Sequence, residues 1–163
     1  MKCVGNENQI ATFYPNSLEE IKEDAELKKR NKLSVTFVEN ILGMMNNWLD
    51  QNPNPDRLIL ARGPAMCTKE NFAVGLFLFS DVIIVARKLM KNRKYKIQLV
   101  IEIDTNFEVS QNKLEVTFKN GSKEFSVSFS DLGNASMWQQ YANYCKKSLT
   151  AQEEFPAEME NVM

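Results

Sequence analysis

The stretch ARKLMKNRKYK, residues 86–96, carries the densest group of basic side chains in the sequence. Its six cations are Arg87, Lys88, Lys91, Arg93, Lys94 and Lys96. Cations held close to an anionic membrane contribute about 1 kcal/mol each, so this run would hold a protein weakly at a lipid surface. A second interpretation stays open, because exposed lysine and arginine also protect the edges of sheets and keep loops soluble.

The residue types that most enzymes need are absent or poorly placed. The chain has no histidine, which excludes histidine general bases, Ser-His and Cys-His pairs and the common zinc sites. Its six glycines are not spaced as a phosphate-binding loop. The adjacent carboxylates Glu19-Glu20 and Glu153-Glu154 lie in charge runs that are typical of a solvated face. The sequence therefore predicts a non-catalytic protein without a metal or cofactor.

Length and composition set the remaining limits. The 163 residues, of which 44% are apolar, suffice for one domain and an appendage. The net charge of -1 provides no overall basic field for nucleic acid. Cys3, Cys67 and Cys145 lack a C-x-x-C spacing, which favours a reduced environment. No apolar segment suits a targeting signal or a membrane span. We expect a cytoplasmic protein, peripheral at the membrane if the basic run binds lipid.

The first fifty residues predict an arm followed by helix. Residues 1–15 are polar and mixed, which indicates a mobile arm. Ser17 and Glu20 form a capping-box pattern, so a helical segment is expected over residues 16–52. Its second half carries an apolar stripe at three- and four-residue steps. The stripe consists of Val38, Ile41, Leu42, Met45, Trp48 and Leu49. The prolines of the following NPNP motif end the helix.

The periodicity changes after these prolines. The stretch VGLFLFSDVIIVARK, Val74–Lys88, is too short and too interrupted to cross a membrane. Its β-branched and aromatic residues predict two antiparallel strands that turn at Ser80-Asp81. A short strand around Leu58–Ala61 is expected before this hairpin, ended by a break at Gly63-Pro64. The nearly continuous apolar character of the hairpin indicates a sheet covered on both faces.

Short strands continue to about residue 129. The expected strands cover residues 58–61, 71–79, 82–87, 95–103, 107–109, 114–118 and 125–129. Asn120-Gly121 is a strong hairpin signal, because both positions tolerate positive φ. A helix is then expected from about Asn134, and residues 151–163 predict a flexible acidic tail. Its apolar face comprises Trp138, Tyr141, Ala142, Cys145 and Leu149. This order indicates a mainly β fold, a seven-stranded antiparallel curled barrel or sandwich capped by a C-terminal helix.

The same order of elements resembles the pleckstrin-homology (PH) domain, and in particular its members in regulators of Rho-type GTPases. The residues that carry the resemblance are Leu76–Asp81 (LFLFSD), Val82–Val85 (VIIV), Tyr95-Lys96, Arg62-Gly63-Pro64 and Trp138. The match runs from about Arg57 to Leu149, so a PH-like domain is expected over residues 56–150. It implies structural roles for Trp138 in the closing helix, Asp81 in the hairpin turn and Gly121 in the later turn.

The resemblance also bears on activity. In exchange factors the last helix of a Dbl-homology domain leads into the PH domain, and residues 16–52 fit that position. Some fifty upstream residues are too few for a complete catalytic domain. GTPase-activating proteins carry similar PH domains, so both parent classes stay open. Lipid-binding members place a lysine late in the first strand and a basic-x-arginine pair in the second; here Phe72–Gly75 takes the second position and only Lys69 lies nearby.

Two functions follow as hypotheses. The first is a non-catalytic PH-type adaptor of a Rho-GTPase signalling regulator, such as a guanine nucleotide exchange factor, with weak charge-driven contacts to phosphoinositide-containing membranes. Lys69 and the six cations of residues 86–96 are its candidate anion-binding residues. The alternative is a purely protein-interaction domain that binds a Rho-family GTPase or another signalling protein. In this case the helix packs on the barrel or on a partner through its candidate partner-binding residues, which are Val38, Ile41, Met45 and Trp48. Neither hypothesis involves nucleic acid or metal.

Overall fold

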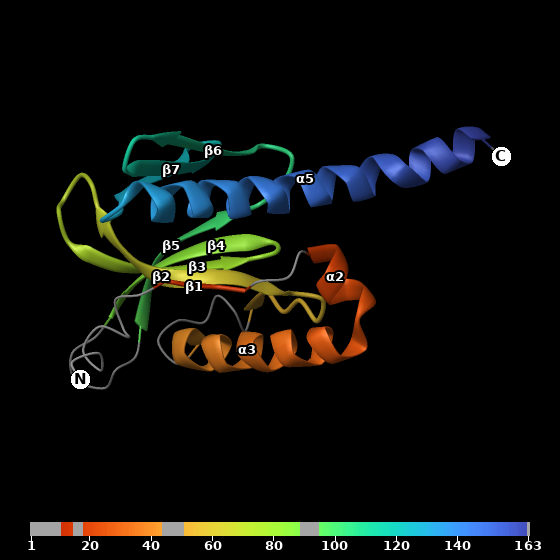
Figure 1. Ribbon diagram of the computed structural model, residues 1–163, viewed down its shortest axis with the longest axis horizontal. Coiled ribbons are helices and arrows are strands. Elements are labelled where there is room, and N and C mark those ends of the chain that lie inside the picture. Colours follow the sequence, from red (N-terminus) through yellow and green to blue (C-terminus); the bar gives the residue numbers. More distant parts are fainter. Residues whose placement is uncertain (1–10, 15–17, 44–50, 89–94, 163) are drawn as a thin grey trace.

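The computed structural model describes residues 11–14, 18–43, 51–88 and 95–162, which form a curled antiparallel sheet between two helical layers (Figure 1). The helices are α2 (Leu18–Glu23), α3 (Ala25–Gly43) and α5 (Leu132–Val162). The strands are β1 (Thr12–Phe13), β2 (Ile59–Cys67), β3 (Ala73–Phe79), β4 (Val82–Lys88), β5 (Tyr95–Glu102), β6 (Phe107–Asn112), β7 (Glu115–Asn120) and β8 (Lys123–Ser128). The strand order is β5-β4-β3-β2-β8-β7-β6, with β1 also paired to β2. The predicted fold class is confirmed, and the sheet is not closed.

The hairpin predicted for Val74–Lys88 is present as β3 and β4, with its turn at Ser80-Asp81. Successive residues of β3 enter different core clusters: Leu76 and Leu78 pack under α5, whereas Phe77 and Phe79 pack under α3. Side chains alternate between the two faces of a strand. Because both faces are covered, the hairpin is apolar at nearly every position.

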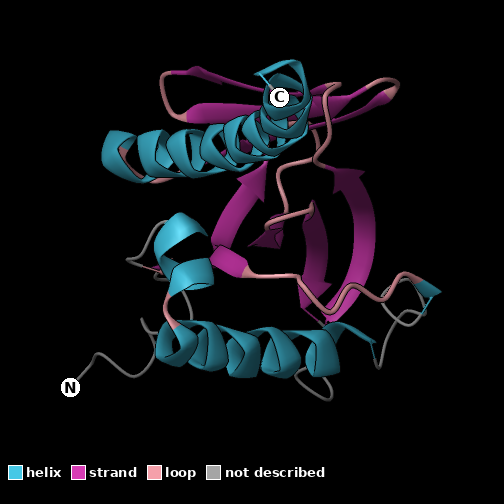
Figure 2. Cartoon of the chain, turned by 90° about the vertical axis from the view of Figure 1, so that its right-hand side faces the viewer, coloured by secondary structure: helices cyan, strands magenta, loops and turns pink. Residues whose placement is uncertain are grey.

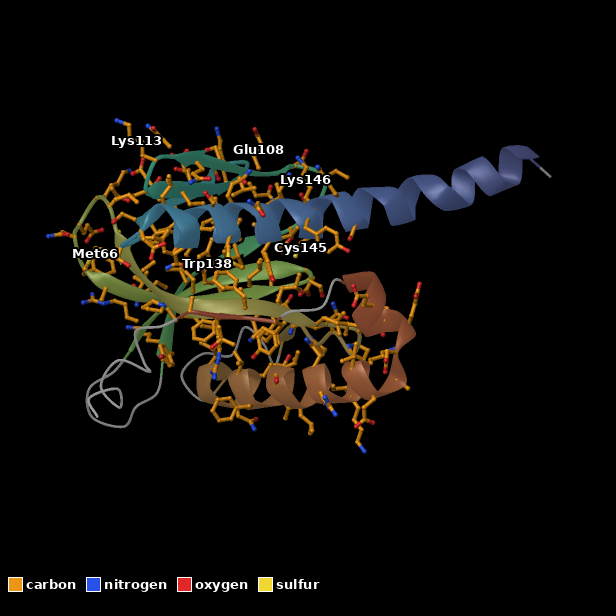
Figure 3. The ribbon with its side chains drawn as sticks, viewed as in Figure 1. Met66, Glu108, Lys113, Trp138, Cys145 and Lys146 are labelled. Atoms are coloured by element: carbon orange, nitrogen blue, oxygen red, sulfur yellow. The ribbon has the colours of Figure 1, made fainter. Side chains whose placement is uncertain are left out.

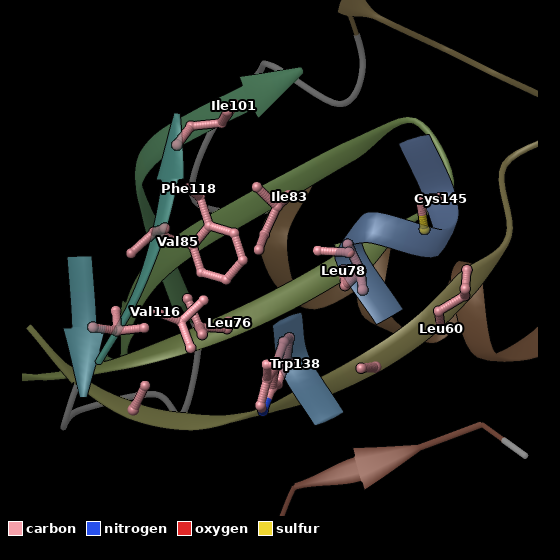
Figure 4. Close-up of a cluster of buried hydrophobic side chains, with 14 of the residues drawn as sticks. Leu60, Leu76, Leu78, Ile83, Val85, Ile101, Val116, Phe118, Trp138 and Cys145 are labelled. Atoms are coloured by element: carbon pink, nitrogen blue, oxygen red, sulfur yellow. The ribbon is translucent and has the colours of Figure 1, made fainter. Parts of the chain in front are cut away.

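The first core cluster lies between α5 and the inner face of the sheet. Trp138 and Cys145 extend from α5 toward the sheet (Figure 3), and Figure 4 shows them in one cluster with Leu76 and Leu78 of β3. The Trp138 ring also stacks on Phe129, with 5.9 Å between the ring centroids. The α5 stripe predicted from the sequence therefore caps the curled sheet.

α3 lies on the opposite face of the sheet (Figure 2), and its buried side chains belong to the second core cluster. Val35, Val38 and Leu42 follow one another at three- and four-residue steps on α3, and all three are buried in this cluster. Asp24 separates α3 from α2 and caps it, because its Oδ1 accepts hydrogen bonds from the N–H groups of residues 26 and 27 at 2.9 and 3.2 Å. The predicted capping box includes Ser17, which lies outside the described residues.

The gap between β5 and β7 is bridged by side chains. Asn120 Nδ2 donates to the Glu102 carbonyl at 2.8 Å and to Asp104 Oδ1 at 3.0 Å, and Lys123 Nζ donates to the Val100 carbonyl at 3.1 Å. These residues flank the predicted turn, in which Gly121 adopts a φ of 63°. Glycine is favoured at this position because, without a Cβ, it adopts a positive φ at no steric cost. The turn thus holds the two halves of the sheet together where no strand ladder joins them.

The predicted break at Gly63-Pro64 is wrong, because β2 continues through these residues to Cys67. Pro64 lies opposite Gly75 of β3. On its other side β2 pairs with β1 up to Arg62 and with β8 only from Met66. Proline cannot donate a ladder hydrogen bond, but the position between these two partners requires none.

The structure describes parts of both predicted terminal segments. Of the mobile arm predicted for residues 1–15, residues 11–14 are described, and residues 12 and 13 form β1 on the edge of β2. In the flexible tail predicted for residues 151–163, α5 continues to Val162; the flexibility of both segments stays a prediction. The tail holds four glutamates and two alanines, which favour a helical backbone, and one residue that opposes it, Pro156. An unpatterned helical tail lacks an apolar stripe, which is the signal that sequence reasoning relied on.

We expect Trp138→Ala to lower the free energy of unfolding by about 3–5 kcal/mol, the usual range for truncating a large buried aromatic side chain. Trp138 is 0% exposed, whereas its neighbour Met137 on the same helix is 37% exposed. Met137→Ala is therefore the matched control and should cost less than about 1 kcal/mol. Urea unfolding followed by circular dichroism measures both; equal losses would show that α5 is not a structural cap.

Candidate anion-binding surface and helix clamp

Two of the predicted cations face each other across neighbouring strands. Arg87 of β4 pairs with Lys96 of β5, and both side chains are exposed. Like charges directly opposite each other are destabilising in a sheet. An anion bound between them would relieve this repulsion, so the pair is a candidate site for phosphate or carboxylate groups.

Phe72 holds the guanidinium of Arg87. The Arg87 Cζ lies 4.4 Å from the centroid of the Phe72 ring, a cation–π geometry. Phe72 follows the turn after β2, where its carbonyl accepts the Cys67 N–H at 2.7 Å. Sequence reasoning treated Phe72 only as the loss of a cation and missed its role as a platform. A nearby aromatic in an otherwise charged region was the available signal.

Lys69 lies at the same end of the sheet. It is exposed in the turn between β2 and β3, beside Asn71, whose φ is 57°. Because β3 and β4 are antiparallel, this turn lies at the same end of the sheet as the last residues of β4 and the first residues of β5. The structure thus brings Lys69, Arg87 and Lys96 to one region of the surface. Lys91, Arg93 and Lys94, and the side chain of Lys88, lie outside the described part.

The second-strand position that would carry a phosphate-binding arginine is closed. A Cβ built on Gly75 would lie 3.0 Å from Cε1 of Tyr95, whose ring packs edge-on against Phe77 at 5.2 Å. Burial raises the pKa of the Tyr95 hydroxyl, against an opposing effect of Arg62. A neutral aromatic ring therefore fills the space, and the cations form an open surface without a cradle.

A buried guanidinium clamps α3 to the sheet. The side chain of Arg57 is 1% exposed and donates to both Asp81 carboxylate oxygens, at 3.0 Å from Nε and 2.9 Å from Nη2. Its Nη1 donates to Glu39 of α3 at 3.0 Å, and Nη2 also donates to the Asn52 carbonyl at 3.1 Å. Burial by itself lowers the pKa of Arg57, because it disfavours the charged form. The hydrogen bonds and negative charges of Asp81, and then of Glu39, outweigh this effect, so the pKa is raised. Arg57 is thus charged, and each of its three guanidinium nitrogens donates a hydrogen bond.

Asn31 supplies a second clamp. Its side-chain amide donates to the Ile59 carbonyl and its Oδ1 accepts the Ile59 N–H, both at 2.8 Å. Sequence reasoning found few anchors in the charged run around Asn31 and missed this residue. Its position four residues before Val35, on the same stripe as Val38, was the available signal.

The predicted partner-binding face is partly occupied. Val38 is fully buried against the sheet, so within this chain it contacts the barrel-like core. The side chain of Ile41, and Met45 and Trp48 as a whole, lie outside the described residues. Exposed apolar side chains of α3 are instead Leu33, at 66% exposure, and Phe37, at 55%.

In the part of the chain that the structure describes, no group of three or more metal-ligating side chains is present. No described helix is long and apolar enough to cross a membrane. The described cysteines, Cys67 and Cys145, are buried free thiols.

The comparisons with known proteins bear on the family resemblance and on the fold. No protein-family model matches the chain. It is 26% identical over 127 residues to pleckstrin homology domain-containing family F member 2 of Homo sapiens, which covers 73% of this chain and 49% of that protein. The Gallus gallus protein of the same name is 25% identical with the same coverage. The chain spans about half the length of the curated relatives it matches.

Solved structures with the same fold are DH/PH units of Rho exchange factors. The linker-DH/PH domains of p115-RhoGEF match with a TM-score of 0.58 and 11% identity over 74% of this chain and 40% of that chain. An activated truncation of Vav1 matches with a TM-score of 0.57 and 12% identity over 72% and 33%. The DH/PH domain of human ARHGEF11 was solved with RhoA and an inhibitor. It matches with a TM-score of 0.53 and 9% identity, over 68% of this chain and 35% of that chain. The chain therefore has a PH-like fold, and the resemblance inferred from the sequence is confirmed.

We expect Arg57→Ala to lower the free energy of unfolding by about 3 kcal/mol, the low end for breaking a buried ion pair. The low end applies because the side chains of Asp81 and Glu39 are 32% and 33% exposed and can be rehydrated. Arg30→Ala is the control, since Arg30 forms an exposed pair with Glu26 that contributes less than about 1 kcal/mol. Urea unfolding measures the loss of stability in both variants. Equal losses for Arg57→Ala and Arg30→Ala would contradict the proposed clamp.

We expect Cys145 to resist alkylation in the folded protein. Burial, with a smaller contribution from Asp81 and against Lys22, raises its thiol pKa to about 12. Only the thiolate is nucleophilic, so almost none is present at pH 8. Iodoacetamide treatment followed by peptide mass spectrometry should leave Cys145 unmodified in buffer and modified in urea. Rapid labelling in buffer would show that α5 opens readily.

Proposed function

We propose that this chain is a non-catalytic PH-type adaptor module of a Rho-GTPase signalling regulator, with weak, charge-driven contacts to anionic membranes. The observation that carries the membrane proposal is the exposed Arg87–Lys96 pair across β4 and β5, with Lys69 at the same end of the sheet. The PH-like fold and the resemblance to DH/PH units support the adaptor role.

The proposed contact depends on charge and does not select one headgroup. Tyr95 fills the space beside Gly75, and no described side chain converges with Arg87 and Lys96 to enclose a phosphate. At about 1 kcal/mol per cation, the cluster supports a reversible association that a second contact would strengthen. Phe72 stabilises the orientation of Arg87 toward the surface.

A protein-interaction function is the second candidate. Leu33 and Phe37 lie four residues apart on α3, with exposures of 66% and 55%, and the Arg62 guanidinium of β2 lies 5.4 Å from the centroid of the Phe37 ring. Arg57 and Asn31 hold this helix against the sheet, so its exposed part is presented rigidly. Relatives of the same fold were solved in complex with RhoA, which supports a Rho-family GTPase or a similar signalling protein as the partner.

We expect binding to anionic vesicles to depend on total charge. Vesicles that match in charge, with either phosphatidylserine or a phosphoinositide as the anionic lipid, should co-sediment the protein equally, and binding should fall steeply with salt because exposed charges are screened beyond about 10 Å at 0.1 M. Replacing Lys91, Arg93 and Lys94 by serine should remove at most about 3 kcal/mol of attraction. Lys69→Ser should matter little.

The matched control removes the same charge elsewhere. Lys28, Lys29 and Arg30 are exposed on α3, and their replacement by serine should leave vesicle binding nearly unchanged. Selection of one phosphoinositide at physiological salt, lost in Lys69→Ser, would reveal a headgroup pocket and contradict the proposal. Absence of vesicle binding at every salt concentration would favour the protein-interaction alternative.

A further inference from the structure

Residues 11–14, here called the arm segment, fill an edge of β2 that β8 leaves free. The two residues of β1 pair antiparallel with β2, and the Tyr14 N–H donates to the Leu60 carbonyl at 2.9 Å. β8 pairs with β2 only from Met66 onward. Figure 1 shows β1 running beside β2 on the α3 side of α5. The arm segment is therefore bound as an added strand, a common mode of peptide recognition.

One wall of this site is aromatic and belongs to α5. The Phe13 ring lies edge-on to Trp138, with 5.5 Å between centroids and 64° between planes, and edge-on to Tyr141 at 5.1 Å and 65°. The Tyr141 hydroxyl also donates to the Tyr14 carbonyl at 3.3 Å. The site thus binds an aromatic side chain through Trp138 and Tyr141, and a backbone carbonyl through the Tyr141 hydroxyl.

The β2 side of this site requires a small residue. A Cβ added to Gly63 would lie 2.6 Å from the Cα and 2.7 Å from the Cβ of Ala11, so a glycine here lets the two backbones approach closely. Alternate residues of the arm segment face opposite sides: Ala11 and Phe13 pack on the cluster under α5, and Tyr14 packs on the cluster under α3. The pattern that fits is small-x-aromatic-aromatic.

We propose that the edge of β2 from Leu60 to Gly63, together with Trp138 and Tyr141, is a strand-addition site for a partner protein. The partner offers an extended, uncharged segment with a small residue two positions before an aromatic one. The arm segment occupies this groove as an internal ligand until the partner displaces it. Its ladder involves only two residues, and a short ladder near a chain end opens locally at a lower free-energy cost than the strands of the core.

A partner is favoured over a second copy of this chain by the balance of contacts. Reciprocal exchange of arm segments between two copies would replace each contact by an identical one and would lose the freedom of one molecule. A partner without such a groove gives up nothing equivalent when it binds. This inference does not depend on the proposed membrane contact.

The test uses a fluorescent peptide with the sequence NQIATFYPN, residues 8–16. Fluorescence anisotropy measures its binding to the full chain and to the full chain with Phe13→Ala, which weakens the internal ligand. The variant should bind at least about tenfold more tightly, because an attached competitor acts at high effective concentration. A peptide with alanine in place of its phenylalanine should bind neither chain. Equal affinity of both chains for the first peptide would overturn the proposal.

A glycine pair provides the matched control. In the Phe13→Ala background, Gly63→Ala should abolish peptide binding, since its Cβ would occupy the space of the small residue. Gly133→Ala in α5, where a Cβ would meet only Asp131 Oδ1 at 3.4 Å, should leave binding unchanged. Circular dichroism checks that each variant is folded. Binding that survives Gly63→Ala in a folded chain would show that the peptide lies elsewhere.

A reversible lock keeps the test decisive if the variants unfold. Thr12 and Arg62 are cross-strand partners, so a Thr12→Cys, Arg62→Cys chain with Cys3→Ser would join the arm segment to β2 on oxidation. The oxidised chain should not bind the peptide, and reduction should restore the binding of the unlocked chain. Peptide binding by the locked chain would overturn the proposal. Cross-links between two chains on oxidation, with a dimer in light scattering, would assign the groove to a second copy and would also overturn it.

Discussion

The buried guanidinium of Arg57 is the interaction on which the arrangement of this protein depends. Arginine stays charged under all physiological conditions, and a charge inside a protein requires partners that compensate for the loss of water. Asp81 in the turn of the β3–β4 hairpin and Glu39 on α3 supply them. The start of β2, the hairpin turn and the N-terminal helix are therefore held as one unit. Without the helix in this position, the core cluster around Phe77 and Ile84 would face water.

This constraint decides which surfaces remain for function. Because α5 covers one face of the β3–β4 hairpin and α3 covers the other, neither face is free to bind a partner. Two other surfaces are the end of the sheet that carries Lys69, Arg87 and Lys96, and the exposed part of α3. The first is cationic and open, and the second is apolar at Leu33 and Phe37. The two proposed functions correspond to these two surfaces.

The incomplete closure of the sheet has a separate consequence at β2. This strand changes partner along its length, from β1 at Arg62 to β8 at Met66. Gly63 and Pro64 stand at the change, where a close backbone approach is needed and a ladder donor is not. An edge that another strand does not cover is open to pairing, and here the chain covers it with its own arm segment. The aromatic wall of α5 then serves both as a cap of the core and as a contact for Phe13.

Local sequence patterns alone determined the β3–β4 hairpin, the turn at Gly121 and the burial of Trp138. Each depends on periodicity or on turn residues, which neighbours in the chain express directly. The end of the sheet shared by Lys69 and Arg87 followed from the same hairpin. Only the tertiary structure decided the pairing of Arg57 with Asp81, 24 residues away, and of Asn31 with Ile59, 28 residues away. The platform role of Phe72 and the strand through Pro64 belong with them, because they depend on strand register and on packing between distant segments, which no local pattern records.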